Sequence, residues 1–336
     1  MITNVAPVYD YEKYSAMKNI SFEPSDDRFF HYTSSGTCFK MLENKTIDKD
    51  DGKIILELWA THTRFMNDSK EMTGGCEDIE KFLVNEKKSN ILEEFKKIIP
   101  KTDSNFNAFA LQDPNHYSIS FCGKNNLLSQ WTYYGAKTGV AIEYDLNNCF
   151  LKGDSSNIDE WSDATRPYKI LYKNNDKEIK IRAVLKAFSD GRDDNYNTEI
   201  TALQLLYLSS FMKDEAYCEE SESRLLFTPY YTIGKNQNEK MNKVLSLIKF
   251  RESNGIILPY LPIQIKHKES NKFPIKSITV GPGRNQEFVF NSLILFIQSN
   301  FQTTDSRCKD IEEEGQFKSY MIGDIILRRS LIPFRG

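Results

Sequence analysis

The residues of this chain that could carry out chemistry gather in one short segment, Glu220-Ser221-Glu222-Ser223-Arg224-Leu225-Leu226-Phe227. If 220–227 is a β-strand, its side chains alternate between two faces, so that Glu220, Glu222 and Arg224 share one face. Burying two carboxylates and a guanidinium in a core carries a large desolvation penalty. The pattern therefore indicates either a functional site or a solvent-exposed edge strand.

Composition limits the class of protein. The chain has 336 residues, of which 40% are hydrophobic and 27% charged, as in an ordinary folded protein. Its formal charge of -3 and its scattered basic residues argue against a surface built as a whole to bind nucleic acid, although a local basic patch stays open. No apolar run approaches the length of a membrane span, and the first residues lack a signal-peptide pattern. We therefore expect a cytoplasmic protein with no membrane partner.

Cysteine and histidine spacing predicts no metal site. The six cysteines lie far apart without a Cys-x-x-Cys pair, which favours reduced thiols. The four histidines, His31, His62, His116 and His267, show no metal-ligand spacing. The glycine-containing stretches 135–139 and 281–284 lack the spacing of phosphate-binding loops, and at 281–284 we expect a simple turn.

Hydrophobic periodicity predicts an α+β chain. Strand patterns cover 29–32, 54–60, 117–122, 138–144, 220–227, 255–261, 275–280 and 324–327. Helical patterns cover 77–98, 127–134, 176–213 and 287–299. Since no repeat, low-complexity tract or clear linker is present, we expect a single domain over 1–336 with a helical insertion at about 174–213. Glu143, in the strand pattern 138–144, is expected to face solvent or to line a cleft.

A series of short blocks runs in order from residue 29 to residue 335. The first blocks are Phe30-His31-Tyr32-Thr33-Ser34, Leu58-Trp59-Ala60, Arg64-Phe65-Met66-Asn67-Asp68, Ser118-Ile119-Ser120-Phe121, Leu128-Ser129-Gln130-Trp131, Tyr134-Gly135 and Thr138-Gly139-Val140-Ala141-Ile142-Glu143-Tyr144. The later blocks are Lys213-Asp214-Glu215-Ala216-Tyr217, Glu220-Ser221-Glu222-Ser223-Arg224, Val280-Gly281-Pro282 and Ser330-Leu331-Ile332-Pro333-Phe334-Arg335. This series resembles a bacterial family of uncharacterised proteins, the domain-of-unknown-function family numbered 2971. The chain departs from the family pattern at Ser223, where an aromatic residue is usual, and at Gln130, where a hydrophobic residue is commoner.

That family is similar to the ADP-ribosyltransferase superfamily, and the resemblance implies a split β-sheet core flanked by helices, with NAD as the co-substrate. The superfamily builds its NAD site from an early strand with a His or Arg, an aromatic-bearing segment and a late strand with a Glu. By this resemblance Glu222 is the catalytic carboxylate, and Glu220 activates or orients the acceptor. The resemblance assigns NAD binding to His31, Tyr32, Thr33, Asn67, Trp131, Tyr134 and Arg224.

Several of these residues also have a plain structural interpretation. His31 among aromatic neighbours is typical of a hydrogen-bonded core residue, and Trp131 at helical spacing from Leu127 is more typical of core than of a stacking platform. Arg224 either clamps the NAD pyrophosphate or pairs with Glu220 and fixes its rotamer. Asn67 either contacts the adenosine side of NAD or belongs to a turn.

The function that the resemblance implies is NAD-dependent ADP-ribosyl transfer to a nucleic acid or protein inside a bacterial cell, as in a toxin or a phage-defence effector. An antitoxin or sensor protein is the partner expected of such an effector. Cleavage of the nicotinamide–ribose bond passes through a sugar cation, which a nearby carboxylate stabilises. NAD hydrolysis is a related alternative. Two other classes stay open: a catalytically silent module of the same fold that binds a nucleotide or partner, and a metal-dependent nuclease built on Glu220, Glu222 and Asp68.

Overall fold

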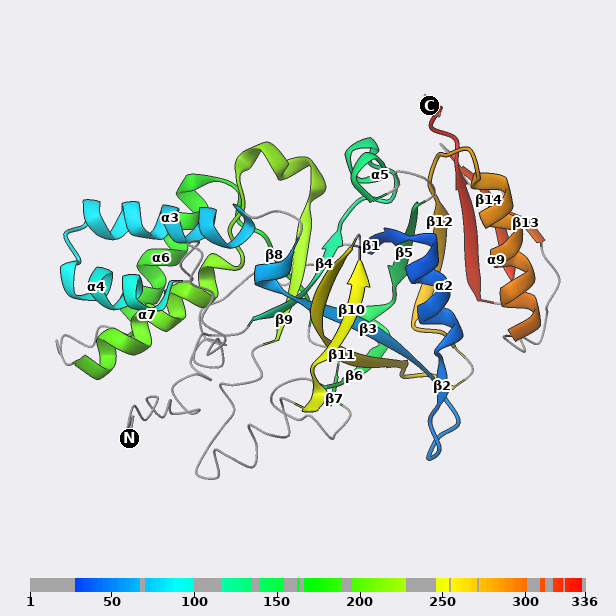
Figure 1. The fold of residues 1–336 in the computed structure, drawn as a ribbon, viewed down its shortest axis with the longest axis horizontal. Coiled ribbons are helices and arrows are strands. Elements are labelled where there is room, and N and C mark those ends of the chain that lie inside the picture. The colour runs from blue at the N-terminus through cyan, green and yellow to red at the C-terminus, as the bar shows by residue number, and fades with distance from the viewer. Residues whose placement is uncertain are drawn as a thin grey trace.

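One mixed β-sheet contains every strand that the structure describes, and helices cover and flank it (Figure 1). The computed structural model describes residues 28–66, 70–99, 116–134, 139–153, 162–163, 166–188, 195–227, 246–253, 255–270, 272–300, 309–311, 317–322 and 324–333. The strands are β1 (Phe29–Ser34), β2 (Thr46–Ile47), β3 (Ile54–His62), β4 (Tyr117–Cys122), β5 (Gly139–Tyr144), β6 (Cys149–Lys152), β7 (Ser162–Asp163), β8 (Tyr168–Lys169), β9 (Glu222–Phe227), β10 (Lys249–Ser253), β11 (Ile256–His267), β12 (Ile275–Val280), β13 (Lys309–Ile311), β14 (Phe317–Ile322) and β15 (Ile325–Ser330). The helices are α2 (Ser35–Glu43), α3 (Lys70–Asn85), α4 (Ser89–Ile98), α5 (Leu128–Tyr134), α6 (Asn174–Phe188), α7 (Asn195–Ser209) and α9 (Gln286–Asn300), with short 3-10 helices η2 (Thr63–Phe65), η3 (Leu146–Asn148) and η4 (Glu215–Glu220).

The α+β class predicted from periodicity is confirmed. The strands β1, β4, β5 and β12 lie where strands are predicted, and α5 and α9 lie where helices are predicted. The helical pattern over 77–98 belongs to two helices, α3 and α4, which are separated by a turn containing Lys87 at a φ of 55°. The strands β10 and β14 have no counterpart in the prediction, because their residues do not alternate clearly between apolar and polar.

The sheet divides at β4. Along one edge β4 pairs with β9 from Tyr117 to Cys122. Along its other edge Cys122 pairs with β1, whereas Tyr117 and Ser118 pair with β3. Between these contacts, residues 119–121 pair with neither β1 nor β3, so the two strands diverge from β4 like the arms of a fork. The sheet is therefore split at this point, and its assignment to the ADP-ribosyltransferase architecture stays a prediction.

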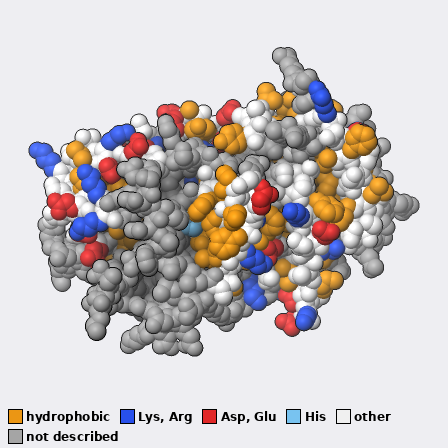
Figure 2. All heavy atoms as spheres, viewed as in Figure 1, with side chains coloured by type: hydrophobic (Ala, Val, Ile, Leu, Met, Phe, Trp, Pro, Cys, Tyr) orange, Lys and Arg blue, Asp and Glu red, His pale blue; other side chains and the backbone are white. Residues whose placement is uncertain are grey.

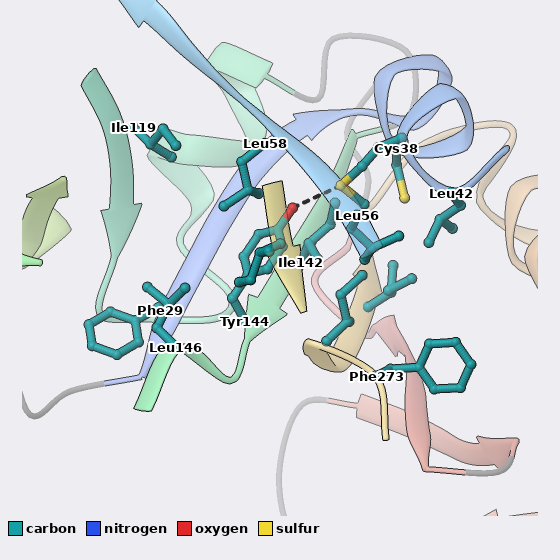
Figure 3. Packing of buried hydrophobic residues seen from close by; sticks show 14 of the residues in the cluster. Phe29, Cys38, Leu42, Leu56, Leu58, Ile119, Ile142, Tyr144, Leu146 and Phe273 are labelled. Atoms are coloured by element: carbon teal, nitrogen blue, oxygen red, sulfur yellow. Dashed lines mark hydrogen bonds between the residues drawn. The ribbon is translucent and has the colours of Figure 1, made fainter. Parts of the chain in front are cut away.

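The main apolar core lies on one face of the sheet, beneath α2 and α9 (Figure 1). In α2 the buried residues Cys38, Met41 and Leu42 recur at helical spacing, which presents one apolar face to the strands. Ser34 caps this helix, since its Oγ accepts a hydrogen bond from the Thr37 amide at 3.1 Å. Figure 3 shows Leu42, Leu56, Leu58 and Tyr144 among the residues of this core. Each fully buried leucine contributes roughly 2 kcal/mol to folding.

A second apolar core joins α3, α4, α6 and α7 beside β9. The predicted insertion over 174–213 contains α6 and α7, but these helices share their core with α3 and α4 from residues 70–98. The helices α3 and α7 cross closely at Gly75, where a Cβ atom would lie 2.4 Å from the Ser209 carbonyl oxygen. In the part of the chain that the structure describes, no helix combines the length and hydropathy that crossing a membrane requires.

The hairpin of β10 and β11 carries exposed hydrophobic side chains. Phe250, Ile256 and Ile257 are each more than half exposed. Figure 2 shows hydrophobic side chains gathered over these two strands near the centre of the face in view. The same hairpin also carries Arg251, whose side chain turns toward β3.

Candidate functional site

Four charged side chains meet where β9 begins. The Lys213 Nζ atom lies 2.7 Å from an oxygen of Glu220 and 3.1 Å from Oε2 of Glu222. The Arg224 Nε atom donates to Oε1 of Glu222 at 2.5 Å. The side chain of Arg224 is 2% exposed and that of Glu222 5%, against 14% for Glu220. The result is a buried network of two cations and two anions, which we call the β9 ion network (Lys213, Glu220, Glu222 and Arg224).

The prediction that Glu220 lies on the strand is wrong. Glu222 and Arg224 share a face of β9 as predicted, but Glu220 ends the 3-10 helix η4. Ser221 joins the two elements in the left-handed conformation, with a φ of 46°, which is strained for a residue with a Cβ atom. Neighbouring groups hold this turn, since the Gly123 amide donates to the Ser221 carbonyl oxygen at 3.1 Å. The turn brings the carboxylates of Glu220 and Glu222 to Lys213, although the two residues do not lie on one strand.

Residues from three other segments hold the β9 ion network in place. The Gln130 side-chain amide, from α5, donates to Glu220 at 2.9 Å. The Arg224 Nη1 atom donates to the Ser210 carbonyl oxygen at 2.8 Å, just after α7. The Glu222 amide donates to the Tyr172 hydroxyl at 2.9 Å, and the Tyr217 ring centroid lies 4.8 Å from the Lys213 ammonium. Arg224 was expected to clamp a pyrophosphate or to pair with Glu220; the carboxylate it pairs with is that of Glu222.

The Glu222 carboxyl is held in its ionised form. Burial by itself would raise the pKa of Glu222, but the charges of Arg224 and Lys213, together with the Arg224 hydrogen bond, outweigh burial and lower the pKa to about 2. Burial and the nearby Glu222 charge raise the pKa of the Tyr172 phenol, so this hydroxyl stays neutral. At neutral pH Glu222 therefore carries a negative charge that Arg224 and Lys213 balance, and its carboxylate can accept hydrogen bonds or face a developing cation but cannot donate a proton.

Tyr32 and Trp131 are core residues on the same face of the sheet as Glu222. They pack with Cys122, whose register partner on β9 is Glu222. Their rings lie 4.7 Å apart, and Trp131 is 3% exposed. The Trp131 ring also covers Gly281 so closely that a Cβ atom there would lie 2.5 Å from it. The core interpretation of Trp131 is confirmed, and its packing fixes α5 and hence Gln130.

His31 lies on the opposite face of the sheet from Glu222. Its ring packs edge-on against Phe121 of the main core, with ring centroids 6.3 Å apart. Its Nδ1 atom lies 3.0 Å from the Ser120 carbonyl oxygen, which belongs to the stretch of β4 that neither β1 nor β3 pairs. Burial lowers the pKa of His31, and the Arg251 charge lowers it further against the opposing effect of the Ser120 hydrogen bond. The structure therefore places His31 in the split of the sheet rather than beside the β9 ion network.

The remaining predicted residues contribute less to the site. Thr33 lies on β1 and is 9% exposed. Tyr134 is the last residue of α5, and its side chain lies outside the described residues. Asn67 and Asp68 also lie outside the described residues. Within the described ranges, no group of three or more His, Cys, Asp and Glu side chains is arranged to hold a metal ion.

Sequence reasoning assigned no role to Lys213 or Tyr172. Lys213 belongs to the block Lys213-Asp214-Glu215-Ala216-Tyr217 on which the family resemblance rests, and that block was its only signal. Gln130 drew notice only as a departure from the family pattern, although its amide bonds Glu220 directly. A polar residue in place of a hydrophobic one, in a short helix next to the carboxylates, was the available hint.

Residues 130–225 match the model of a family described as "Protein of unknown function (DUF2971)". The predicted family resemblance is confirmed over this segment, which we call the DUF2971 segment. It contains most of α5, all of α6 and α7, and all four members of the β9 ion network. No curated protein and no solved structure gives a significant match to the chain. The region that carries the family signal is thus also the region that forms the β9 ion network.

Proposed function

We propose that this protein is an NAD-dependent ADP-ribosyltransferase in which Glu222 is the catalytic carboxylate. The observation that carries the proposal is the buried Glu222 carboxylate within the DUF2971 segment, held by Arg224 at 2.5 Å and by Lys213 at 3.1 Å. Cleavage of a ribose–nicotinamide bond develops positive charge on the ribose, and a preorganised anion in a site of low polarity stabilises that charge strongly. To Glu220, which shares Lys213 with Glu222, the proposal assigns the orientation of the acceptor nucleophile.

Access of a substrate to Glu222 requires one contact to open. Both oxygens of the carboxylate are engaged, Oε1 by Arg224 at 2.5 Å and Oε2 by Lys213 at 3.1 Å. Lys213 holds Glu220 more closely, at 2.7 Å. If Lys213 moves toward Glu220, it frees Oε2 for a ribose hydroxyl while Arg224 keeps the carboxylate ionised and oriented. The two cations thus have different roles, one as a fixed partner and the other as a displaceable one.

The proposal is tested with labelled NAD and a bacterial lysate. We expect the wild-type chain to transfer label to nucleic acid or protein, and Glu222→Gln to lower the rate about 100-fold or more. Glu143→Gln is the matched control, because Glu143 is also buried and is held by Arg28 at 2.6 Å, but lies outside the β9 ion network. Release of nicotinamide without transfer would assign NAD hydrolysis. Equal transfer by the wild type and a folded Glu222→Gln variant would refute the role of Glu222.

One observation favours a second candidate, a catalytically silent module that binds a nucleotide or partner. The Glu222 carboxylate is almost fully buried and has both oxygens paired, which is also the arrangement of a purely structural ion network. This candidate predicts that NAD binds without turnover and that Glu222→Gln changes stability but not the chemical fate of NAD. The labelled-NAD experiment therefore separates the two functions.

A further inference from the structure

The β10–β11 hairpin holds an arginine whose charge has no carboxylate partner in the part of the chain that the structure describes. The Arg251 Nη2 atom donates to the Thr61 hydroxyl of β3 at 3.0 Å. Its guanidinium carbon lies 5.2 Å from the centroid of the Trp59 ring, also on β3. Its Nε atom is buried and makes no hydrogen bond. Arg182, by contrast, is paired with the carboxylate of Glu86 at 2.8 Å.

The surroundings of Arg251 are aromatic and cationic. Tyr260 of β11 lies beside Trp59, with ring centroids 5.3 Å apart. Lys249 lies two residues before Arg251 on the same face of β10, and Glu57 is bonded to Lys249 at 3.1 Å. The charge of Lys249 is thus neutralised by Glu57, whereas that of Arg251 is not neutralised within the described residues. Burial lowers the pKa of Arg251, which is the direction expected for a cation that lacks a nearby anion.

A half-buried guanidinium that lacks a carboxylate partner can bind an anion. Guanidinium groups bind phosphate and carboxylate oxygens through paired N–H donors, and the aromatic rings around Arg251 keep its plane oriented. Arg251 donates through Nη2 to a single neutral hydroxyl, and within the described residues no hydrogen bond occupies its Nη1 atom, so this end of the guanidinium is left for a ligand. Lys249 is already paired with Glu57, so the uncompensated charge at this place is that of Arg251, and a phosphate offers its fork more oxygens and more charge than a carboxylate does.

We propose that Arg251, with Thr61, Trp59 and Tyr260, forms a phosphate-binding site on the β3–β10–β11 part of the sheet, for a phosphate that is free or carried by a nucleotide. The site lies beside the split in the sheet, since Thr61 pairs with Ser118 of β4, where the split begins. It shares no residue with the β9 ion network, and it stands whether or not Glu222 is catalytic.

The test is titration of the full chain with inorganic phosphate and with ADP, followed by calorimetry and by tryptophan emission. We expect both ligands to bind the wild type and Arg251→Gln to weaken both at least 10-fold, with Arg251→Lys in between because it keeps the charge but loses the planar fork. Arg182→Gln is the matched control and should bind as the wild type does, since Arg182 is paired with Glu86 on the helical part.

The two ligands distinguish the source of the phosphate. Tighter binding of ADP than of inorganic phosphate, lost in Arg251→Gln, supports a nucleotide site; equal binding supports a site for free phosphate. The proposal is overturned if neither ligand binds at millimolar concentration, or if both bind equally well to Arg251→Gln. Circular dichroism of each variant establishes that a loss of binding is not a loss of fold.

Discussion

A buried histidine next to the β9 ion network gives a prediction whose size follows from the structure. His116 is fully buried, and its Nδ1 atom lies 3.1 Å from the hydroxyl of Ser210, the residue whose carbonyl accepts from Arg224. Burial, and then the charge of His62, lower the pKa of His116 to about 3. The imidazole is therefore neutral in the folded chain throughout the physiological range.

The sign of the pH dependence follows from this shift. In the unfolded chain His116 takes up a proton below its ordinary pKa of 6.5, whereas the folded chain does not. The stability that the neutral ring contributes is thus complete above pH 6.5 and is lost as the pH falls from 6.5 toward 3. One proton corresponds to about 1.4 kcal/mol per pH unit, so the wild type should lose about 1.4 kcal/mol between pH 7.5 and 5.5 through this residue.

Urea unfolding at a series of pH values measures this loss. Glutamine at position 116 does not titrate, so the free energy of unfolding of His116→Gln should fall less steeply below pH 6.5 than that of the wild type. The difference in slope corresponds to the uptake of at most one proton on unfolding. Ser210→Ala is the control, because it removes the hydroxyl partner and keeps the imidazole, and it should retain the wild-type slope. Parallel curves for wild type and His116→Gln would refute the reasoning, since His116 would then titrate alike in both states.

Two further predictions concern packing and charge. Lys213→Met leaves the carboxylates Glu220 and Glu222 with Arg224 as the cation that remains in the network, so we expect the free energy of unfolding in urea to fall by about 3–5 kcal/mol. The double variant Lys213→Met with Glu220→Gln should recover part of this loss, because one unpaired carboxylate is then removed. Additive losses in the two single variants and the double variant would contradict the shared contact. Gly75→Ala places a Cβ atom 2.4 Å from the Ser209 carbonyl oxygen and should destabilise the chain by roughly 1–3 kcal/mol. The control is Gly74→Ala in the same helix, whose Cβ atom would meet nothing within 4 Å and which should be neutral or stabilising. Equal effects of the two substitutions on the melting temperature would rule out the close helix crossing.

Local patterns predicted the elements better than they predicted the partners of charged residues. The strand β4 and the helix α5 follow from alternation and helical spacing, which depend only on neighbouring residues. Glu143 was expected to face solvent or to line a cleft, but it is buried, because Arg28 and Ser277 from distant segments supply its hydrogen bonds. Such pairing depends on the order of strands in the sheet, which periodicity does not contain.

The candidate site shows the same division. That Glu222 and Arg224 share a face follows from strand alternation, and the structure agrees. The cation that joins Glu220 to Glu222 could not be predicted, because Lys213 reaches them through η4 and the left-handed turn at Ser221. A serine in that conformation carries no signal in the sequence, since glycine is the residue usually expected there.

The shared core of the four helices has a consequence for how the chain is made. The helices α3 and α4 are complete at Ile98, where α4 ends, but α7, against which they pack, ends at Ser209. On a ribosome the apolar faces of the first pair therefore emerge about a hundred residues before their partner does. Contacts of such long sequence separation slow folding, and the exposed faces are the surfaces that a chaperone would recognise. If synthesis pauses between α4 and α7, the nascent chain exposes apolar helix faces that can aggregate, whereas after α7 has emerged these faces can pack together.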